Sequence, residues 1–356
     1  MAYIKLKRKS LHHNYQYLSK QLEKQDISWG IVSKLLCGNK KYIQEVINLG
    51  IDEIHDSRIS NLKAVKELDP KIQTVYIKPP AKKFIKSIVE YADVSFNTEL
   101  STIRLISAEA KRQDKLHKII IMIEMGDLRE GVMGEQLLSF YGKVFELPNI
   151  SVVGIGTNLN CLHGVMPSAD KLIQLSLYEQ LIEAKFDKKI PWVSGGTSVV
   201  FPLLMHKQLP KGINHFRIGE TLYFGNNLVT EKPIKGMKSD VFTLNAQIIE
   251  LIKKPKVPTG ELATNPSGES FEIDEEDYGK KSYRAILDLG LLDISTDFMT
   301  PVDKGIKITG ASSDMLVIDL GSSKRNFKVG DWVKFKLKYM GALSLLNSSY
   351  IDKVVE

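Results

Sequence analysis

Cysteine and long apolar runs are both scarce in this chain. Only Cys37 and Cys161 occur among its 356 residues, which excludes a disulfide framework and is typical of proteins in a reducing compartment. No stretch resembles a membrane-spanning segment, and the basic start "MAYIKLKRKS" lacks the apolar core of a secretory signal. The sequence therefore predicts a cytoplasmic protein with no membrane partner.

A concentration of charge of one sign is also lacking. The chain carries 49 Lys and Arg against 42 Asp and Glu, but the two signs are interleaved and no basic run exceeds three residues. This pattern argues against a nucleic-acid partner and favours a solvated surface with some attraction for anionic ligands. With 43% hydrophobic residues and enough length for two domains, the composition is that of a globular enzyme or binding protein.

Short apolar runs alternate with helical patterns such as "KKYIQEVINLGI" over the first 232 residues. The runs are nearly continuous, as parallel strands covered on both faces should be. Eight strand–helix units in this length predict a (β/α)8 barrel over residues 1–232. The expected strands are residues 28–34, 52–57, 72–78, 93–97, 118–125, 152–158, 191–195 and 214–218.

The pattern changes after residue 232. Segments such as "SYRAILDLGLLDIST", "KGIKITGA" and "DWVKFKLKYM" are short, β-branched and partly alternating, with Gly, Asp and Ser between them. They predict a smaller, mostly β domain over residues 233–356.

Lys34 stands at the end of the first expected strand, where a barrel of this kind carries its functional groups. One interpretation is a strand-end lysine whose ammonium reaches solvent. The other is a nucleophile, which requires lowering its pKa from about 10.4 to about 7–8, roughly 4 kcal/mol of differential interaction. Burial together with Arg129 and Arg217 can supply that interaction.

The segment "SGGTS" follows the seventh expected strand. Its glycines can expose backbone N–H groups to an anion, and the hydroxyls of Ser194, Thr197 and Ser198 add donors. A glycine turn capped by Ser or Thr is also common without any ligand. The motif "RIGE" after the next strand strengthens the interpretation as a phosphate site, because such sites often follow strands seven and eight of a barrel.

Arg217 lies inside the apolar pattern of the last barrel strand, where a buried guanidinium needs partners for its donors. Two hypotheses remain: a structural salt bridge with a carboxylate, or a fixed cation that faces a ligand atom. A lysine, a phosphate cradle and an arginine facing a ring together describe a site for pyridoxal 5'-phosphate, with no metal.

Eight motifs support a family resemblance over about residues 3–350. The chain resembles the fold-type III pyridoxal phosphate enzymes, the alanine-racemase-like superfamily, and within it the ornithine racemase branch. The shared segments are "VSKLLCGN", "DSRISNL", "MIEMGDLREGV", "GIGTNLNC", "SGGTS", "LPKGINHFRIGE", "GASSD" and "PSGE".

The resemblance implies roles for individual residues. Lys34 matches the lysine that bonds covalently to the cofactor and acts as one proton-transfer base, and Arg217 matches the arginine at the pyridine nitrogen. Arg129 lines up with an arginine near the substrate carboxylate, and Asn158 stands where alanine racemases carry a histidine near the cofactor ring. The implied phosphate site comprises Ser194, Thr197, Ser198, the backbone of Ile218 and Gly219, and Tyr339 from the β domain.

The residue that serves the opposite face of the substrate is not identified by the resemblance. Leu291 stands at the position of the catalytic tyrosine of alanine racemases, and Met315 at that of a histidine in ornithine racemases. Cys161, Asp314 and Tyr283 are candidates for the second base. For Cys161 the sequence favours a small buried thiol over a catalytic group, whereas for Asp314 a turn-capping role and a catalytic role are equally compatible with the sequence.

The implied activity is that of a pyridoxal phosphate-dependent amino-acid racemase. It would interconvert the L- and D-forms of ornithine or a similar basic amino acid by removing the Cα proton on one face and returning one on the other. Asp127 and Glu130 are candidate partners for a distal ammonium, or else carboxylates that stabilise a helix N-terminus. The resemblance also implies a homodimer with shared active sites.

The sequence leaves one alternative function open and argues against another. A non-catalytic pyridoxal phosphate-binding or carrier protein of the same fold is the main alternative, supported by the missing tyrosine and histidine. No histidine follows His215 in the sequence, which argues against the metal-dependent aldolases and dehydratases of this fold type.

Overall fold

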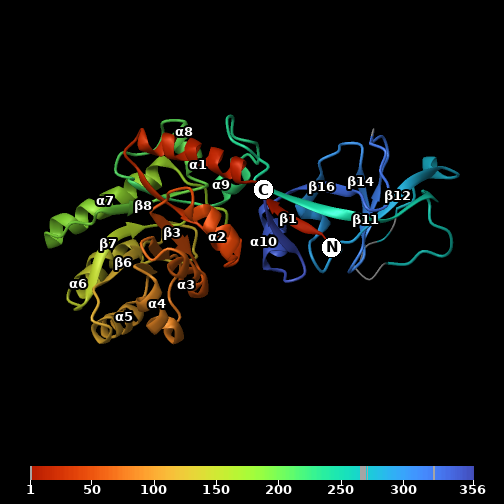
Figure 1. Cartoon of the computed structure of the whole chain (residues 1–356). Coiled ribbons are helices and arrows are strands. Elements are labelled where there is room, and N and C mark those ends of the chain that lie inside the picture. The colour runs from red at the N-terminus through yellow and green to blue at the C-terminus, as the bar shows by residue number, and fades with distance from the viewer. Residues whose placement is uncertain (1, 265–269, 271, 324) are drawn as a thin grey trace. The chain divides into compact units, whose positions relative to one another are not determined.

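The structure is a computed structural model that describes residues 2–264, 270, 272–323 and 325–356 (Figure 1). The chain forms two compact units: residues 9–239, and residues 1–8 together with 240–356. Within the described residues, no helix is both long and apolar enough to cross a bilayer. The motif "PSGE" (266–269), one of the eight that support the resemblance, lies outside the described residues.

A parallel barrel forms the centre of the first unit, and all eight expected strands are present. The strands pair in the order β8-β7-β6-β5-β4-β3-β2-β10-β9. A ninth strand, β9 (Gly196–Thr197), follows β8 after the single residue Gly195; it pairs with β10, while β8 pairs with β7. The ring therefore closes where the seventh expected strand breaks at Gly195. The others are β2 (Ser28–Val32), β3 (Glu53–Asp56), β4 (Gln73–Tyr76), β5 (Val94–Asn97), β6 (His117–Met122), β7 (Ile150–Gly156), β8 (Trp192–Ser194) and β10 (His215–Ile218).

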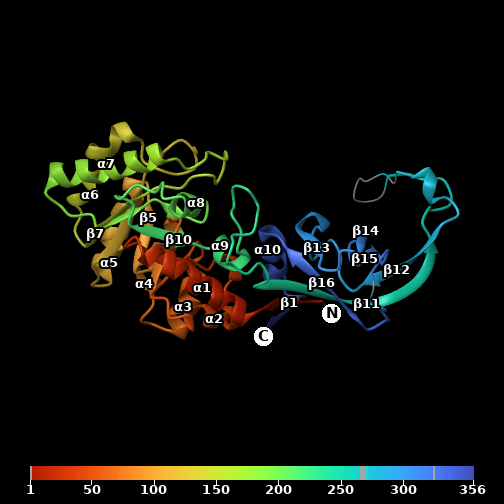
Figure 2. The ribbon, with the colours of Figure 1, turned by 90° about the horizontal axis from the view of Figure 1, so that it is seen from above.

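Helices follow the strands of this unit and surround them in the view of Figure 2. Side chains cap the starts of two of them: Asn39 accepts the Tyr42 N–H ahead of α2, and Ser168 accepts the Lys171 N–H ahead of α7. The helices are α1 (Arg8–Glu23), α2 (Lys40–Ile47), α3 (Ile59–Leu68), α4 (Ile85–Tyr91), α5 (Leu100–Arg112), α6 (Leu137–Phe145), α7 (Ala169–Phe186), α8 (Phe201–Met205) and α9 (Glu220–Phe224).

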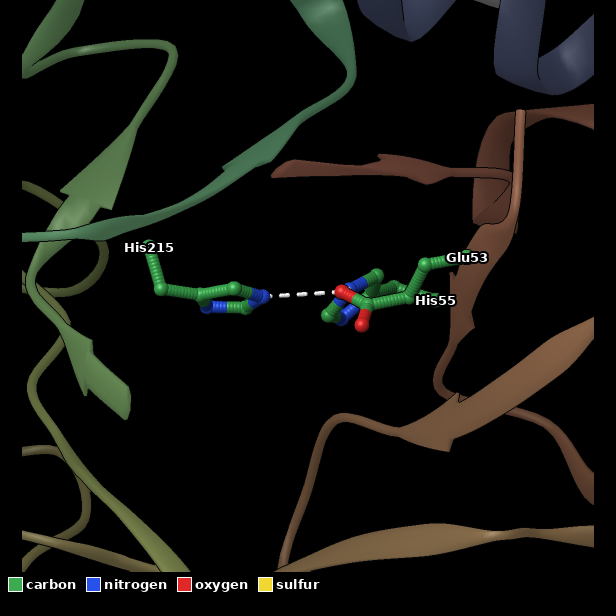
Figure 3. Close-up of side chains that lie close together, drawn as sticks. All are labelled: Glu53, His55 and His215. Atoms are coloured by element: carbon green, nitrogen blue, oxygen red, sulfur yellow. Dashed lines mark hydrogen bonds and ion pairs between the residues drawn. The ribbon is translucent and has the colours of Figure 1, made fainter. Parts of the chain in front are cut away.

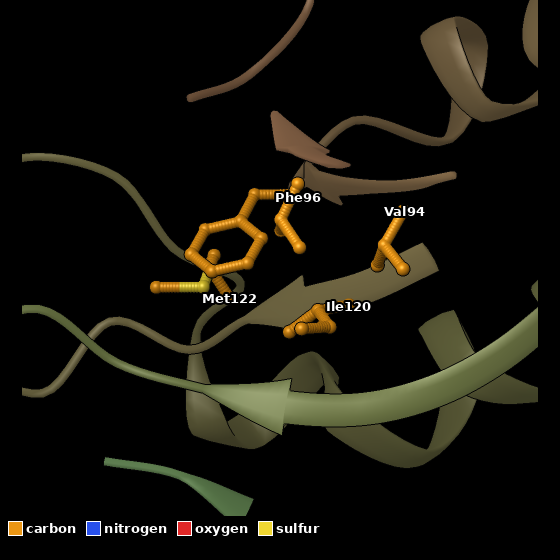
Figure 4. Close-up of a cluster of buried hydrophobic side chains, with 5 residues drawn as sticks. Val94, Phe96, Ile120 and Met122 are labelled. Atoms are coloured by element: carbon orange, nitrogen blue, oxygen red, sulfur yellow. The ribbon is translucent and has the colours of Figure 1, made fainter. Parts of the chain in front are cut away.

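The apolar core of the barrel takes alternate residues from neighbouring strands (Figure 4). Val94 and Phe96 of β5 pack with Ile120 and Met122 of β6 and with Val75 of β4, and each side chain is at most 1% exposed. Alternation places residues i and i+2 on one face of a strand, and each such burial contributes about 1.5–3 kcal/mol. The Phe96 ring of this layer contacts Arg217 of β10, whose Cζ lies 5.2 Å from the ring centroid.

The second unit is a mostly antiparallel β domain, where the sequence predicted a smaller, mostly β domain; its described residues include one α-helix. Its central path runs β13-β16-β11-β12-β15-β14. The elements are β1 (Tyr3–Leu6), β11 (Phe242–Pro255), β12 (Lys281–Leu287), β13 (Met299–Pro301), β14 (Lys307–Ala311), β15 (Leu316–Asp319), β16 (Trp332–Leu337), α10 (Tyr339–Asn347) and β17 (Asp352–Val355).

The first strand, β1, belongs to this β domain. It pairs antiparallel with β11 and parallel with β17, which buries Ile4 and Leu6 completely and sets the Tyr3 ring 4.8 Å from that of Trp332. The expected division at residues 232/233 had counted these first residues with the barrel. The difference arises because strand pairing joins segments that are distant in sequence.

Candidate functional site

Lys34 lies where the site was expected, one residue beyond Ser33 at the end of β2. It begins a short 3₁₀ helix, η1 (Lys34–Leu36), and is exposed, whereas Ser33 is buried. The Ser33 hydroxyl donates to Asp56 Oδ2 at 2.8 Å, and Asn61 Nδ2 donates to Asp56 Oδ1 at 3.1 Å. Burial raises the pKa of the Asp56 carboxyl. Asp56 and Asn61 therefore hold the loop that presents Lys34.

The turn after Lys34 explains the rest of the motif "SKLLCGN". Cys37 and Gly38 both adopt positive φ, 50° and 75°. A Cβ on Gly38 would lie 2.7 Å from Asn61 Oδ1, so glycine is required for space as well as for conformation. Asp56 and Asn61 both belong to the motif "DSRISNL". The sequence analysis used this motif only for the family resemblance and did not predict that it supports the Lys34 loop.

Thr197 and Ser198 form the expected phosphate region between β9 and α9. Ser198 Oγ accepts the N–H groups of Gly219 and Thr221 at 3.2 and 3.3 Å. Thr197 Oγ1 is buried and has no hydrogen-bond partner among the described residues. A buried hydroxyl without a partner is costly, and a phosphate oxygen would satisfy it. This orphaned donor fits the implied cofactor.

Arg217 is almost completely buried in β10 and makes its contacts with neutral groups. Its Nη1 donates to the carbonyl oxygen and to Oγ of Ser194, both at 2.8 Å, and its Nη2 donates to Thr157 O at 2.7 Å and Asn158 Oδ1 at 2.9 Å. Desolvation lowers the pKa of Arg217 to about 10. The expected alternative of a direct salt bridge is wrong for the described residues. Nε has no partner among them, so this N–H donor remains available for a ligand.

Strand pairing brings Lys34, Arg217 and Thr197 to one end of the barrel. β10 pairs on one side with β2, which leads into Lys34, and on the other with β9, in the register Arg217 to Thr197. The hydroxyl of Tyr223 in α9 donates to Val32 O at 3.3 Å and ties the same two strand ends together. A lysine, an arginine and an unpartnered hydroxyl thus come from adjacent strands.

Asn158 connects Arg217 to the loop after β6. While its Oδ1 accepts from Arg217, its Nδ2 donates to Glu130 Oε1 at 2.5 Å. Glu130 also forms a two-point ion pair with Arg129, from both Nε and Nη2, which raises the pKa of Arg129. Arg129, expected near a substrate carboxylate, is therefore ion-paired with the Glu130 carboxylate in this structure.

Asp127 has a structural role that the sequence analysis did not predict. Its two carboxylate oxygens accept the backbone N–H groups of Cys161, Leu162, His163 and Val165 at 2.8–3.2 Å. Desolvation opposes ionisation, but these four donors outweigh it and hold the pKa of Asp127 below its ordinary value. We therefore do not assign Asp127 to a substrate ammonium, because its acceptor positions are already taken.

Cys161 is exposed and lies in the loop held by Asp127. Its Sγ is 3.4 Å from Leu159 O. Desolvation raises the pKa of its thiol, against the opposing effect of Arg129. The thiol is therefore protonated at neutral pH and suits proton donation better than proton removal.

Asp314 and Tyr339 lie in the β domain. Asp314 Oδ1 accepts from the hydroxyls of Ser312 and Ser313 at 3.1 and 3.3 Å, in the turn between β14 and β15. The N–H of Leu291 donates to Ser312 O at 2.9 Å, so Leu291 and Met315, the two departures from the family pattern, lie beside the same turn. Both side chains are partly exposed, 37% and 38%.

A buried cluster of Glu53, His55 and His215 was missed by the sequence analysis (Figure 3). Glu53 Oε1 accepts from His55 Nε2 at 2.5 Å and from His215 Nε2 at 2.8 Å. His215 Nδ1 lies 2.6 Å from Ser194 Oγ. The spacing of these residues could have indicated the cluster. Glu53 and His55 are two residues apart in one apolar strand, as are His215 and Arg217 in another, so each pair shares a face of its strand.

Comparison with known proteins shows which family this chain belongs to. The sequence pattern of the family described as "Alanine racemase, N-terminal domain" matches residues 6–227. A protein named ornithine racemase, from Acetoanaerobium sticklandii, is 35% identical over 344 residues, which cover 96% of each chain. A lysine racemase from Thermotoga maritima is 28% identical over 98% of this chain and 96% of its own.

A solved structure supports the fold. The alanine racemase of Bartonella henselae, whose structure contains covalently bound pyridoxal phosphate, superposes with a TM-score of 0.75. The alignment covers 100% of this chain and 99% of that one at 15% sequence identity. The likeness thus extends over both the barrel and the β domain.

Proposed function

The chain belongs to the alanine racemase N-terminal domain family and is an amino-acid racemase, and from this premise we propose that it uses pyridoxal 5'-phosphate to interconvert L- and D-ornithine or a similar basic amino acid. The similarity to both an ornithine and a lysine racemase over nearly the full chain supports this substrate class. Both of those substrates carry a second amino group. We further propose a cytoplasmic homodimer with shared active sites.

One observation carries the cofactor assignment. Arg217 uses both terminal nitrogens on neutral partners and leaves its Nε–H free among the described residues. The unpartnered hydroxyl of Thr197 belongs to the neighbouring strand β9, where Thr197 pairs with Arg217. When bound, the cofactor withdraws electrons from the substrate and acidifies its Cα–H. Arg217 Nε–H would meet the heterocycle nitrogen, and Thr197 the phosphate.

The remaining residues have the following proposed roles. Lys34 bonds to the cofactor aldehyde and moves the proton at Cα on one face. A guanidinium cannot readily release a proton, so Arg217 keeps the heterocycle nitrogen unprotonated and disfavours side reactions. Arg129 orients the substrate carboxylate and Asn158 lies beside the ring. Ser198, the backbone of Ile218 and Gly219, and Tyr339 complete the phosphate site. Ser194 was also expected there, but its hydroxyl and carbonyl oxygens contact Arg217 and His215, so we propose that it serves the cofactor through Arg217.

The proton donor on the opposite face is proposed to be Cys161, with Asp314 as the alternative. The raised pKa of the Cys161 thiol keeps it protonated at neutral pH, which suits return of a proton to Cα. Asp314 already accepts two hydroxyl donors in its turn, which supports it less.

Hydrogen exchange at Cα tests the proposed function. L-Ornithine in deuterium oxide should gain deuterium at Cα with the pyridoxal phosphate-loaded protein, followed by D-ornithine. Lys34→Ala should abolish both, whereas Lys40→Ala, an exposed lysine of α2, should not. Absence of exchange with every basic amino acid would contradict the proposal. Bound cofactor without exchange would favour a carrier instead.

A further inference from the structure

Resting on the proposed function, we infer that Glu53 and His215 are positioning residues for the cofactor-facing arginine: they act on Arg217 through Ser194. A continuous hydrogen-bond chain joins these four residues inside the barrel. The buried carboxylate of Glu53 stands at one end of this chain and the buried guanidinium of Arg217 at the other.

The two ends of this hydrogen-bond chain set the bond directions. A guanidinium only donates, so Ser194 Oγ accepts from Arg217 Nη1 at 2.8 Å. An ionised carboxylate only accepts, so His215 Nε2 carries a proton and donates to Glu53 Oε1 at 2.8 Å. In the inferred chain His215 is neutral, and its Nδ1 accepts the hydroxyl proton of Ser194 across 2.6 Å. One tautomer of His215 satisfies the whole chain.

Glu53 supplies the negative end. Although burial raises the pKa of this carboxyl, the two histidines outweigh it and hold the pKa well below its ordinary value. Burial lowers the pKa of His55, so His55 is a neutral donor to Glu53. Gln73 Nε2 also donates to Glu53 Oε2, at 2.6 Å. Both oxygens of the Glu53 carboxylate thus accept hydrogen bonds, as a buried anion requires.

A second chain reaches Arg217 from the other side. Asn158 Oδ1 accepts from Nη2 and its Nδ2 donates to Glu130. Both terminal nitrogens are therefore held by groups that are themselves tied to carboxylates, Glu53 and Glu130. These contacts fix the orientation of the guanidinium, and among the described residues Nε–H is its one N–H group without a hydrogen-bond partner.

The packing is adapted to the cluster. The Trp192 ring stacks on His215 at 4.5 Å with an interplanar angle of 6°. A Cβ on Gly30 would lie 2.4 Å from the His55 ring and 2.7 Å from Glu53 Oε1, so a glycine in β2 provides the space that this pair occupies.

A metal ion fits the cluster less well. Nitrogen and oxygen ligands held about 2.0–2.1 Å from zinc in a tetrahedron lie about 3.4 Å from one another. Here Glu53 Oε1 lies 2.5 and 2.8 Å from the two Nε2 atoms, which are hydrogen-bond distances. His215 Nε2 carries the proton that this bond needs.

The experiment uses Glu53→Gln, Ser194→Ala and the double variant of the pyridoxal phosphate-loaded enzyme. Glu53→Gln keeps the shape and removes the charge, whereas Ser194→Ala cuts the chain. Each single variant should lower kcat for L-ornithine about 10-fold with KM changed less than about 2-fold. The NMR signal of the cofactor's ring nitrogen should also shift. Because Glu53 acts through Ser194, the double variant should be no worse than Ser194→Ala.

His117→Gln is the matched control, since His117 is a buried histidine of β6 that does not belong to the hydrogen-bond chain of Glu53, His215, Ser194 and Arg217. It should leave the ring-nitrogen signal unchanged. An unchanged ring-nitrogen signal in Glu53→Gln, or effects of the two single changes that add in the double variant, would overturn the inference.

A measurement on the cofactor-free protein separates this inference from the proposed function. Heteronuclear NMR of the His215 ring should show its proton on Nε2 and an acceptor at Nδ1. A proton on Nδ1 would overturn the hydrogen-bond chain even if the enzyme racemises ornithine. Conversely, if the protein binds no pyridoxal phosphate but its His215 carries the proton on Nε2, the proposed function is wrong and the hydrogen-bond chain is still supported.

Discussion

Ser194 and Arg217 are joined by two hydrogen bonds from a single nitrogen, since Arg217 Nη1 lies 2.8 Å from both the carbonyl oxygen and Oγ of Ser194. Ser194 is the last residue of β8, directly before the break at Gly195 where the barrel closes. The arginine therefore stabilises the closure of the barrel and is held by it. The following predictions concern the groups around this junction.

Thr197→Val should weaken pyridoxal phosphate binding about 10- to 100-fold, since one hydrogen bond to a charged group is lost. The cofactor-free protein should be equally or more stable to heat, because the orphaned Thr197 hydroxyl has no partner to lose. Cofactor titration and thermal unfolding measure the two effects. Thr157→Val is the control: it loses the bond to Ile123 O at 3.0 Å and should destabilise the protein by about 1 kcal/mol.

Asp127→Asn should destabilise the loop of residues 161–165, because one amide oxygen cannot accept the four N–H groups that the carboxylate accepts. We expect a loss of about 1–3 kcal/mol in the free energy of opening this loop. Hydrogen exchange of the Cys161 and Leu162 amides measures it. Unchanged protection of these amides would contradict the assignment of Asp127 to the loop.

The same bonds predict a pH dependence. The folded-state pKa of Asp127 is lowered, so its stabilisation is complete above the unfolded pKa of about 3.9 and is lost as pH falls through the folded value. Protection of the loop amides should therefore persist at neutral pH and decline only in acid. In Asp127→Asn this acid-dependent decline should be absent.

His117 should destabilise the protein in mild acid. Burial lowers its pKa from 6.5 to about 4. Between these two pH values His117 is protonated in the unfolded chain but remains neutral in the folded one. The loss should develop between pH 6.5 and about 4 and reach about 3 kcal/mol. His117→Gln should reduce this loss in denaturant unfolding. His206→Gln, at an exposed histidine, should leave it unchanged.

Cys161→Ala should slow racemisation by about 100-fold or more while Lys34 still exchanges the Cα proton of one enantiomer. Separate deuterium-exchange rates for L- and D-ornithine measure this asymmetry. Asp314→Asn should leave both rates near those of the unaltered enzyme. If Asp314→Asn makes the two exchange rates unequal and Cys161→Ala does not, Asp314 and not Cys161 is the proton donor on the opposite face of the substrate.

Much of the barrel followed from local patterns in the sequence. Apolar runs flanked by helical periodicity identified its strands, because a strand buried on both faces must be apolar throughout. Lys34 and Arg217 were recognisable because each places a positive charge in or at the end of such a run. Leu291 and Met315 were recognisable as departures from the family pattern.

The tertiary structure decided what those charges contact. Strand β1 pairs with β11 and β17 of the β domain, partners that its four residues do not specify. The carboxylate of Asp127 accepts backbone N–H groups, because the loop after β7 places those groups within hydrogen-bond distance of it.

By itself the sequence predicted the eight main barrel strands and the residues that carry charge into the barrel. Only the closure of the ring decided that His215, Ser194 and Glu53 meet behind Arg217. Local periodicity specifies which face of a strand a side chain occupies. Which side chains meet across the barrel depends on the pairing register of strands far apart in the chain, and that register is set by the packing of the whole core.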